Sequence, residues 1–130
     1  MKMNILFLLS IILCGYSCEK LADHTNFIRV HNNTNDTIQV YAGYNYPDTT
    51  LSLEKPRLVM IYPNTQNGGI ESKTDWEDKV ESDTLIVFVL SKDTVDAYSW
   101  EKIRSEYNIL KRYDLSICDL ESQNWTITYP

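Results

Sequence analysis

The sequence predicts a mainly β domain, an antiparallel β-sandwich-like fold with a C-terminal helical segment. Short apolar runs separated by polar turn residues occupy most of the chain. One of these runs, residues 84–90, is continuous enough for a central buried strand. The apolar spacing becomes helical only beyond residue 96. An α+β arrangement around a single sheet is the alternative.

The first part of the domain, "FIRVHNNTNDTIQVYAG", predicts two strands around a polar turn. Apolar and polar residues alternate at positions 28–30 and again at 38–40, which is the pattern of half-buried strands. Residues 32–36 are Asn, Thr and Asp, whose side chains favour turns by bonding their own backbone. We therefore expect a β-hairpin over residues 27–43.

A loop, a strand and a turn are expected next. Prolines at both ends of "YPDTTLSLEKP" mark a loop that begins near Tyr44. "RLVMIY", residues 57–62, predicts a third strand that Pro63 stops. Residues 67–69, Asn-Gly-Gly, predict a further turn, and the acidic stretch around Trp76 predicts one turn of helix.

The last third combines helices with a final strand. The strand "TLIVFVL" is expected in the middle of the core, and "DAYSWEKIRSEY" carries the stripe of an amphipathic helix. Ser116 followed by Asp119 resembles a capping box that opens a short helix through Leu120. Alternation over residues 125–129 predicts a closing strand, and Trp100 and Trp125 are expected in the core.

The N-terminus is typical of a secretory leader. Lys2 precedes an apolar stretch at residues 5–13, and small and polar residues follow. About 20 apolar residues are needed to span a membrane, so this run is too short for a span. We expect residues 1–17 to be removed as a signal peptide.

The residue before each cysteine decides where a lipoprotein signal peptidase would cut. Bulky Leu13 precedes Cys14, whereas the small residues Gly15 and Ser17 stand before Cys18. Cys18 is therefore the predicted site of lipidation, by palmitate-type chains. The same small residues also suit ordinary secretion, which is the alternative.

Cleavage before Cys18 leaves 18–26 as a lipid-anchored tether and 27–130 as a single β-rich domain. Cys118 is then the remaining thiol, and we expect it as a small buried residue under the last helix. In a secreted, unlipidated chain Cys18 and Cys118 could instead form a disulfide.

The chain is acidic. Its formal net charge is −6, and removal of the leader takes away Lys2 and no acid, giving −7. Such a surface repels nucleic acid, so no nucleic-acid partner is expected.

Two stretches, "NNTNDTIQVYAGYNYPDT" and "SWEKIRSEYNILKRYDLSICDLESQNWTITYP", resemble a group of uncharacterised small lipoproteins from Bacteroidetes-type bacteria. The resemblance covers about half of the chain. It implies export and anchoring through Cys18, at the outer membrane of the cell envelope, and leaves open which face of the membrane carries the domain. It implies no activity.

The same resemblance points to O-glycosylation, because these bacteria modify the tripeptide Asp, Ser or Thr, then an aliphatic residue or Thr. The chain has four such sites, at Thr37, Thr49, Thr84 and Thr94. Thr49 is favoured because its loop is expected to be exposed. A structural explanation stands beside this one, since Asp ends turns and Thr with an aliphatic residue starts strands.

The sequence carries no catalytic motif and no metal-ligand spacing. His24 and His31 lack partners at defined intervals, and the acids at residues 75–83 lack the pattern of a calcium loop. We expect a solvated acidic face there, no cofactor, no metal and no enzyme. Tyr44 and Tyr46 are the candidate binding residues, although they would also serve to cover the end of the sandwich.

These observations predict an exported, lipid-anchored envelope protein. Its expected role is that of a non-enzymatic accessory or ligand-binding module, attached to the membrane through its lipid and facing an unknown protein or glycan partner. The alternative is a periplasmic inhibitor or immunity-type lipoprotein that uses its negative charge to bind a basic partner protein.

Overall fold

The computed structural model describes residues 26–80 and 82–130. The expected leader at 1–17, the lipidation site Cys18 and most of the tether with His24 lie outside the described residues. They remain predictions.

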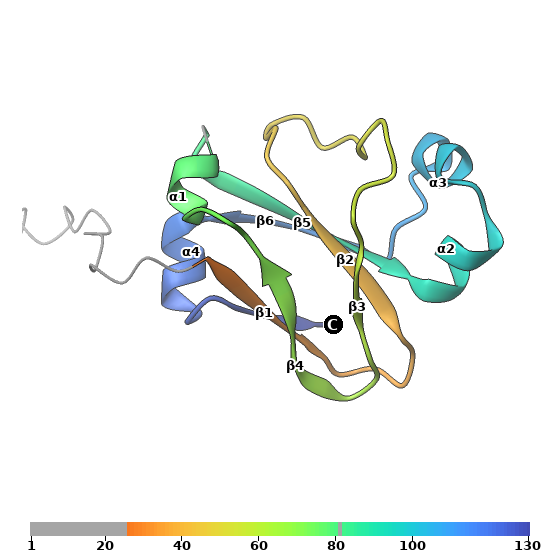
Figure 1. The fold of residues 1–130 in the computed structure, drawn as a ribbon, viewed down its shortest axis with the longest axis horizontal. Helices are drawn as coiled ribbons and strands as arrows, with labels where there is room; N and C mark the ends of the chain where they lie inside the picture. The colour runs from red at the N-terminus through yellow and green to blue at the C-terminus, as the bar shows by residue number, and fades with distance from the viewer. Residues whose placement is uncertain (1–25, 81) are drawn as a thin grey trace, which may run out of the picture.

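The described chain forms two sheets (Figure 1). The three-stranded sheet has the order β4-β1-β7, which are Thr65–Glu71, Phe27–Asn32 and Thr126–Tyr129. The four-stranded sheet has the order β3-β2-β5-β6, which are Val59–Ile61, Ile38–Gly43, Thr84–Ser91 and Lys111–Ser116. All neighbours are antiparallel except β1 and β7, which are parallel. The mainly β, sandwich-like prediction is confirmed, and the single-sheet alternative is wrong.

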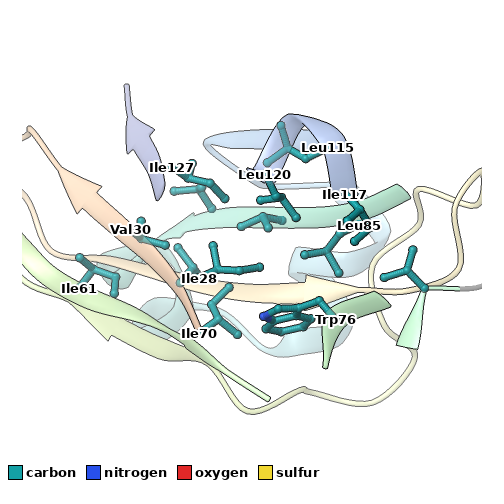
Figure 2. Packing of buried hydrophobic residues seen from close by; sticks show 14 of the residues in the cluster. Ile28, Val30, Ile61, Ile70, Trp76, Leu85, Leu115, Ile117, Leu120 and Ile127 are labelled. Atoms are coloured by element: carbon teal, nitrogen blue, oxygen red, sulfur yellow. The ribbon is translucent and has the colours of Figure 1, made fainter. Parts of the chain in front are cut away.

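The core lies between the two sheets. The position of strand β5 explains why its sequence is apolar, because residues 85–90 are buried on both faces of the sheet. Leu85, Val87 and Val89 belong to the core cluster that also contains Ile28 and Val30 of the first sheet. Figure 2 shows Leu85, Ile28 and Val30 in this cluster. The alternate residues Ile86, Phe88 and Leu90 form a second cluster on the opposite face. The expected central buried strand is confirmed.

The predicted hairpin over residues 27–43 is wrong. Both strands form, but β1 lies in one sheet and β2 in the other. β4 and β7 occupy the two edges of β1, so no edge remains for β2. The polar turn between them carries the chain from one sheet to the other, and the buried side chain of Asn32 holds this corner.

The turn predicted at residues 67–69 is also wrong, because these residues lie inside β4. Gly68 pairs with Val30 and Gly69 with Arg29. A Cβ on Gly68 would come within 2.5 Å of the side chain of Ile61, and one on Gly69 within 2.3 Å of a main-chain oxygen. The glycines therefore permit close packing at this position of a strand.

The described part of the chain also contains four short helices: α1 (Trp76–Lys79), α2 (Lys92–Ala97), α3 (Trp100–Glu106) and α4 (Ile117–Ser122). The expected helical turn at Trp76 and the amphipathic helix containing Trp100 are confirmed, whereas α2 and strand β6 were not predicted. The capping box is confirmed: the Ser116 hydroxyl accepts from the Asp119 N–H at 3.0 Å, and the Asp119 carboxylate accepts from the Ser116 N–H at 2.9 Å.

Three side chains are less buried than expected. Cys118 is exposed, because the inward positions of α4 are Ile117 and Leu120. Trp100 and Trp125 are only partly buried and pack against the edges of the two core clusters. Each places part of its indole ring at the surface, where its N–H can reach a polar partner or water.

Candidate binding site

The most elaborate surface feature is the loop between β2 and β3, residues 44–58, which we call the strap. It lies over the outer face of the four-stranded sheet, next to α3 (Figure 1). Its Leu51 is only 2% exposed and belongs to the second core cluster. The strap is therefore packed onto the domain by one buried side chain near its middle.

Helix α3 holds the strap through three side chains. The Trp100 indole N–H donates to the Ser52 carbonyl at 2.9 Å. The Arg104 Nε donates to the Leu51 carbonyl at 3.2 Å. The Tyr107 hydroxyl, just beyond the helix, donates to the Thr49 carbonyl at 2.9 Å. Because residues four and seven apart share a helix face, one face of α3 holds the strap from residue 49 to 52.

The amphipathic pattern over residues 96–107 identified only two of the three side chains that hold the strap. It singled out Trp100 and Tyr107 for their apolar rings, but in the structure their polar atoms make the contacts. Arg104 was missed because a charged residue does not enter an apolar pattern. Its spacing of four from Trp100 and three from Tyr107 was the available signal.

A cavity of about 500 Å³ lies under the strap, and we call it the strap cavity. Its lining comes from β2, the strap, β5 and α3, and includes Tyr41, Tyr44, Asp48, Leu51, Phe88 and Arg104. The floor is apolar, because Phe88 and Tyr41 are stacked with ring centroids 4.8 Å apart. Burial raises the pKa of Tyr41 to about 12.

The charged groups on the wall of the strap cavity are Asp48 and Arg104. The Asp48 carboxylate accepts hydrogen bonds from the Thr50 N–H at 2.9 Å and from the Thr50 hydroxyl at 2.8 Å. These bonds, with the nearby positive charge of Arg104, lower the pKa of Asp48 below 3.8. The cavity therefore carries a full negative and a full positive charge at neutral pH.

Tyr44 stands where the strap leaves β2. Its ring stacks on Trp76 with centroids 6.3 Å apart, and Lys79 Nζ lies 5.4 Å from the centre of the Tyr44 ring. Burial raises the pKa of its hydroxyl. Tyr44 also lines a second cavity, of about 810 Å³, whose wall includes Phe27, Arg57 and Lys73.

The two candidate tyrosines are therefore placed differently. Tyr44 and Tyr46 are both 37% exposed, but only Tyr44 lines the two cavities. The stacking of Tyr44 on fully buried Trp76 also fits its expected alternative role of covering the end of the sandwich. One ring can serve both purposes, since one of its faces packs on the core.

The four Asp-Thr sites fall in different settings, and all four threonines are partly buried. Thr37 precedes β2 and Thr84 begins β5, as the structural explanation of the tripeptide requires. Thr94 lies in helix α2 and Thr49 in the strap, so strand initiation does not explain them. Glycosylation at these sites stays a prediction.

The described residues, 26–80 and 82–130, provide neither a metal-binding cluster nor a membrane-spanning helix. No group of three or more His, Cys, Asp or Glu side chains there is arranged to hold a metal ion. Within the same residues, no helix has the length and apolar character to cross a membrane.

Comparison with known proteins returned no match: no protein-family model, no curated protein and no solved structure matches the chain. The resemblance to small lipoproteins therefore remains a prediction. The functional proposal rests on the chemistry of the chain itself.

Proposed function

We propose that this chain is an exported protein, lipid-anchored to the cell envelope through Cys18, that binds a ligand or partner with the strap and contributes no catalytic step. The leader-like residues 1–17 support export, and the small residues before Cys18 support anchoring. The single observation that carries the binding role is the strap cavity, a mixed polar and apolar hollow walled by a loop that α3 holds in place.

The hydrogen bonds to the strap matter for binding because they fix the wall before any ligand arrives. Three donors, two from α3 and one from Tyr107 just beyond it, reach main-chain carbonyls within four successive strap residues. A preformed wall loses little conformational entropy on binding, which raises affinity for a given set of contacts. The volume of about 500 Å³ lies within the range of small-molecule sites, roughly 300 to 1,000 Å³.

Intact mass spectrometry tests export and anchoring. The protein purified from its native envelope is compared with a Cys18→Ala variant expressed in the same cells. A chain that starts at Cys18 with added lipid, absent from the variant, is the expected result, and hexose-sized increments would reveal glycosylated threonines. An unlipidated chain two hydrogens lighter than its reduced form would contradict anchoring and indicate a bond between Cys18 and Cys118.

Capture from envelope extracts tests the binding role. The double variant Tyr44→Ala/Tyr46→Ala should keep its fold but lose the partner that the unaltered protein captures. Tyr62→Ala is the matched control, because Tyr62 is 61% exposed and lines neither cavity. Equal capture by the folded double variant would reject the strap as the binding surface. Capture of a basic protein that disappears with salt, unchanged in the double variant, would favour the inhibitor alternative.

A further inference from the structure

The hydrogen bond to the strap uses one of the five N–H donors of the Arg104 guanidinium. Its Nε atom donates to the Leu51 carbonyl, but no hydrogen bond in the described part of the chain involves its two terminal nitrogens. The bond through Nε holds the guanidinium at the cavity wall and leaves the four N–H donors of its two terminal nitrogens for a ligand. Two parallel donors of this kind match a carboxylate, which accepts both at once.

Asp48 presents the opposite charge on the same wall. One carboxylate oxygen, Oδ1, accepts both hydrogen bonds from Thr50, and among the described residues Oδ2 accepts none. No ion pair of 4.0 Å or less joins Asp48 to Arg104 among the described residues. Both side chains are exposed and line the same cavity, and no ion pair between them neutralises the two charges.

The rest of the strap cavity is suited to an apolar group. Leu51, Ile86 and Phe88 form its base, but each is no more than 2% exposed and so is already covered by the protein. The apolar lining that a ligand can contact is Tyr44 and Leu53, which are 37% and 76% exposed. An apolar side chain placed against these two residues would leave water at a gain of roughly 25 cal/mol per Å². The cavity thus combines a cation, an anion and an accessible apolar surface.

We infer that the strap cavity binds a short zwitterionic peptide, a dipeptide with apolar side chains, with its carboxylate on Arg104, its ammonium group at Asp48 and a side chain against Tyr44 and Leu53. This inference rests on the proposed binding role of the strap and names its ligand class. A neutral sugar would use neither charge fully, and a nucleotide phosphate would be repelled by Asp48.

Titration calorimetry with Leu-Leu as the probe tests the inference on the protein purified from its envelope in detergent. N-acetyl-Leu-Leu lacks the ammonium charge, and Leu-Leu amide lacks the carboxylate. Each blocked peptide should bind at least roughly tenfold more weakly than Leu-Leu, because a charge-assisted hydrogen bond is lost. Equal affinity for the free and blocked peptides, or no binding of Leu-Leu, would overturn the inference.

Two variants test which charged group of the peptide Asp48 binds and which Arg104 binds. Asp48→Asn retains an oxygen that can accept from Thr50, so the strap turn is kept, and it should weaken Leu-Leu roughly tenfold while leaving N-acetyl-Leu-Leu unchanged. Arg104→Gln should weaken Leu-Leu and leave the amide unchanged. Lys102→Gln, an exposed position on the same helix, is the matched control. Loss of affinity for every peptide alike would contradict the assignment.

The blocked peptides keep the test decisive if Arg104→Gln fails to fold, because they probe the unaltered protein. If a neutral disaccharide binds and Leu-Leu gives no heat of binding, the ligand is a sugar and the peptide inference is wrong. If Leu-Leu fails while the Tyr44-dependent capture persists, the peptide inference alone is wrong. If charge-dependent Leu-Leu binding is found while capture does not depend on Tyr44, the wider partner-binding role is wrong.

Discussion

Asn32 is fully buried, and both polar atoms of its side chain are hydrogen-bonded. Its Nδ2 donates to the carbonyls of Asp36 at 2.8 Å, Tyr62 at 3.1 Å and Ile61 at 3.2 Å. Its Oδ1 accepts from the N–H and the hydroxyl of Thr34. One side chain thus joins the end of β1, the corner after it and the end of β3.

Replacing Asn32 with Ala should destabilise the domain by about 2 to 4 kcal/mol, because main-chain carbonyls at the corner lose their donor. Urea unfolding measures the change. Asn33→Ala is the control, since Asn33 is exposed and its hydrogen bond to another described residue, the Tyr129 carbonyl, is made by its backbone N–H. A loss within about 0.5 kcal/mol for both variants would show that Asn32 does not hold the corner.

Because of Tyr41, we expect the free energy of unfolding to fall as the pH rises above 10. Burial raises its pKa to about 12 from 10.0, so on raising the pH the unfolded chain ionises first. The favourable contribution is therefore complete below pH 10 and is lost between pH 10 and pH 12, by roughly 3 kcal/mol. Tyr41→Phe should reduce this loss when unfolding is followed from pH 8 to pH 12. An equally steep loss in the variant would contradict the assignment to Tyr41.

At the scale of elements, the sequence predicted local structure better than pairing. The alternation at residues 28–30 and 38–40 located both strands, because it depends on which face of a strand is buried. Their partners depend on distant β4 and β7, which no local pattern contains. The glycines at 68 and 69 suggested a turn for the same reason, since the close approach they permit is visible only in the folded chain.

For the candidate site too, the sequence predicted single residues but not which residues come together. Tyr44 followed from the density of aromatic residues before Pro47. Asp48 was identified only as a loop residue. That it lines the same cavity as Arg104 could be seen only in the fold, because 56 positions separate them.

Helix α3 should control the order of the strap. Trp100→Phe keeps an aromatic ring against the second core cluster but removes the hydrogen bond to the Ser52 carbonyl. We expect a loss of about 1 kcal/mol in the stability of the strap and faster hydrogen exchange at the Thr50 and Ser52 amides. Tyr98→Phe is the control. Unchanged exchange in Trp100→Phe would mean that this bond does not order the strap.

At the scale of the molecule, the described chain forms three layers, because β5 of the four-stranded sheet is covered on both faces. The three-stranded sheet covers one face of the four-stranded sheet, and the strap with α2 and α3 covers the other. The proposed binding surface is built on the outer layer, and the inner core lies between the two sheets (Figures 1 and 2). We therefore expect changes at exposed strap residues to alter binding without unfolding the sandwich.

This layering predicts that both faces of β5 carry stability. Phe88→Ala, on the outer face, should cost about 3 to 5 kcal/mol, as for a buried core residue. Lys111→Ala on exposed β6 should stay within about 0.5 kcal/mol. Chemical unfolding measures both. A small cost for Phe88→Ala would mean that the outer layer contributes little to the stability of the fold.

The central claim, that the strap is where this protein binds its partner, is tested most directly by photo-crosslinking in living cells. A photoreactive phenylalanine analogue is placed at Tyr44, at Tyr62 or at Tyr98, which are all exposed aromatic positions. The predicted result is one adduct, formed from position 44 and from neither control. Adducts formed only from position 62 or 98, or none at all from position 44, would contradict the claim.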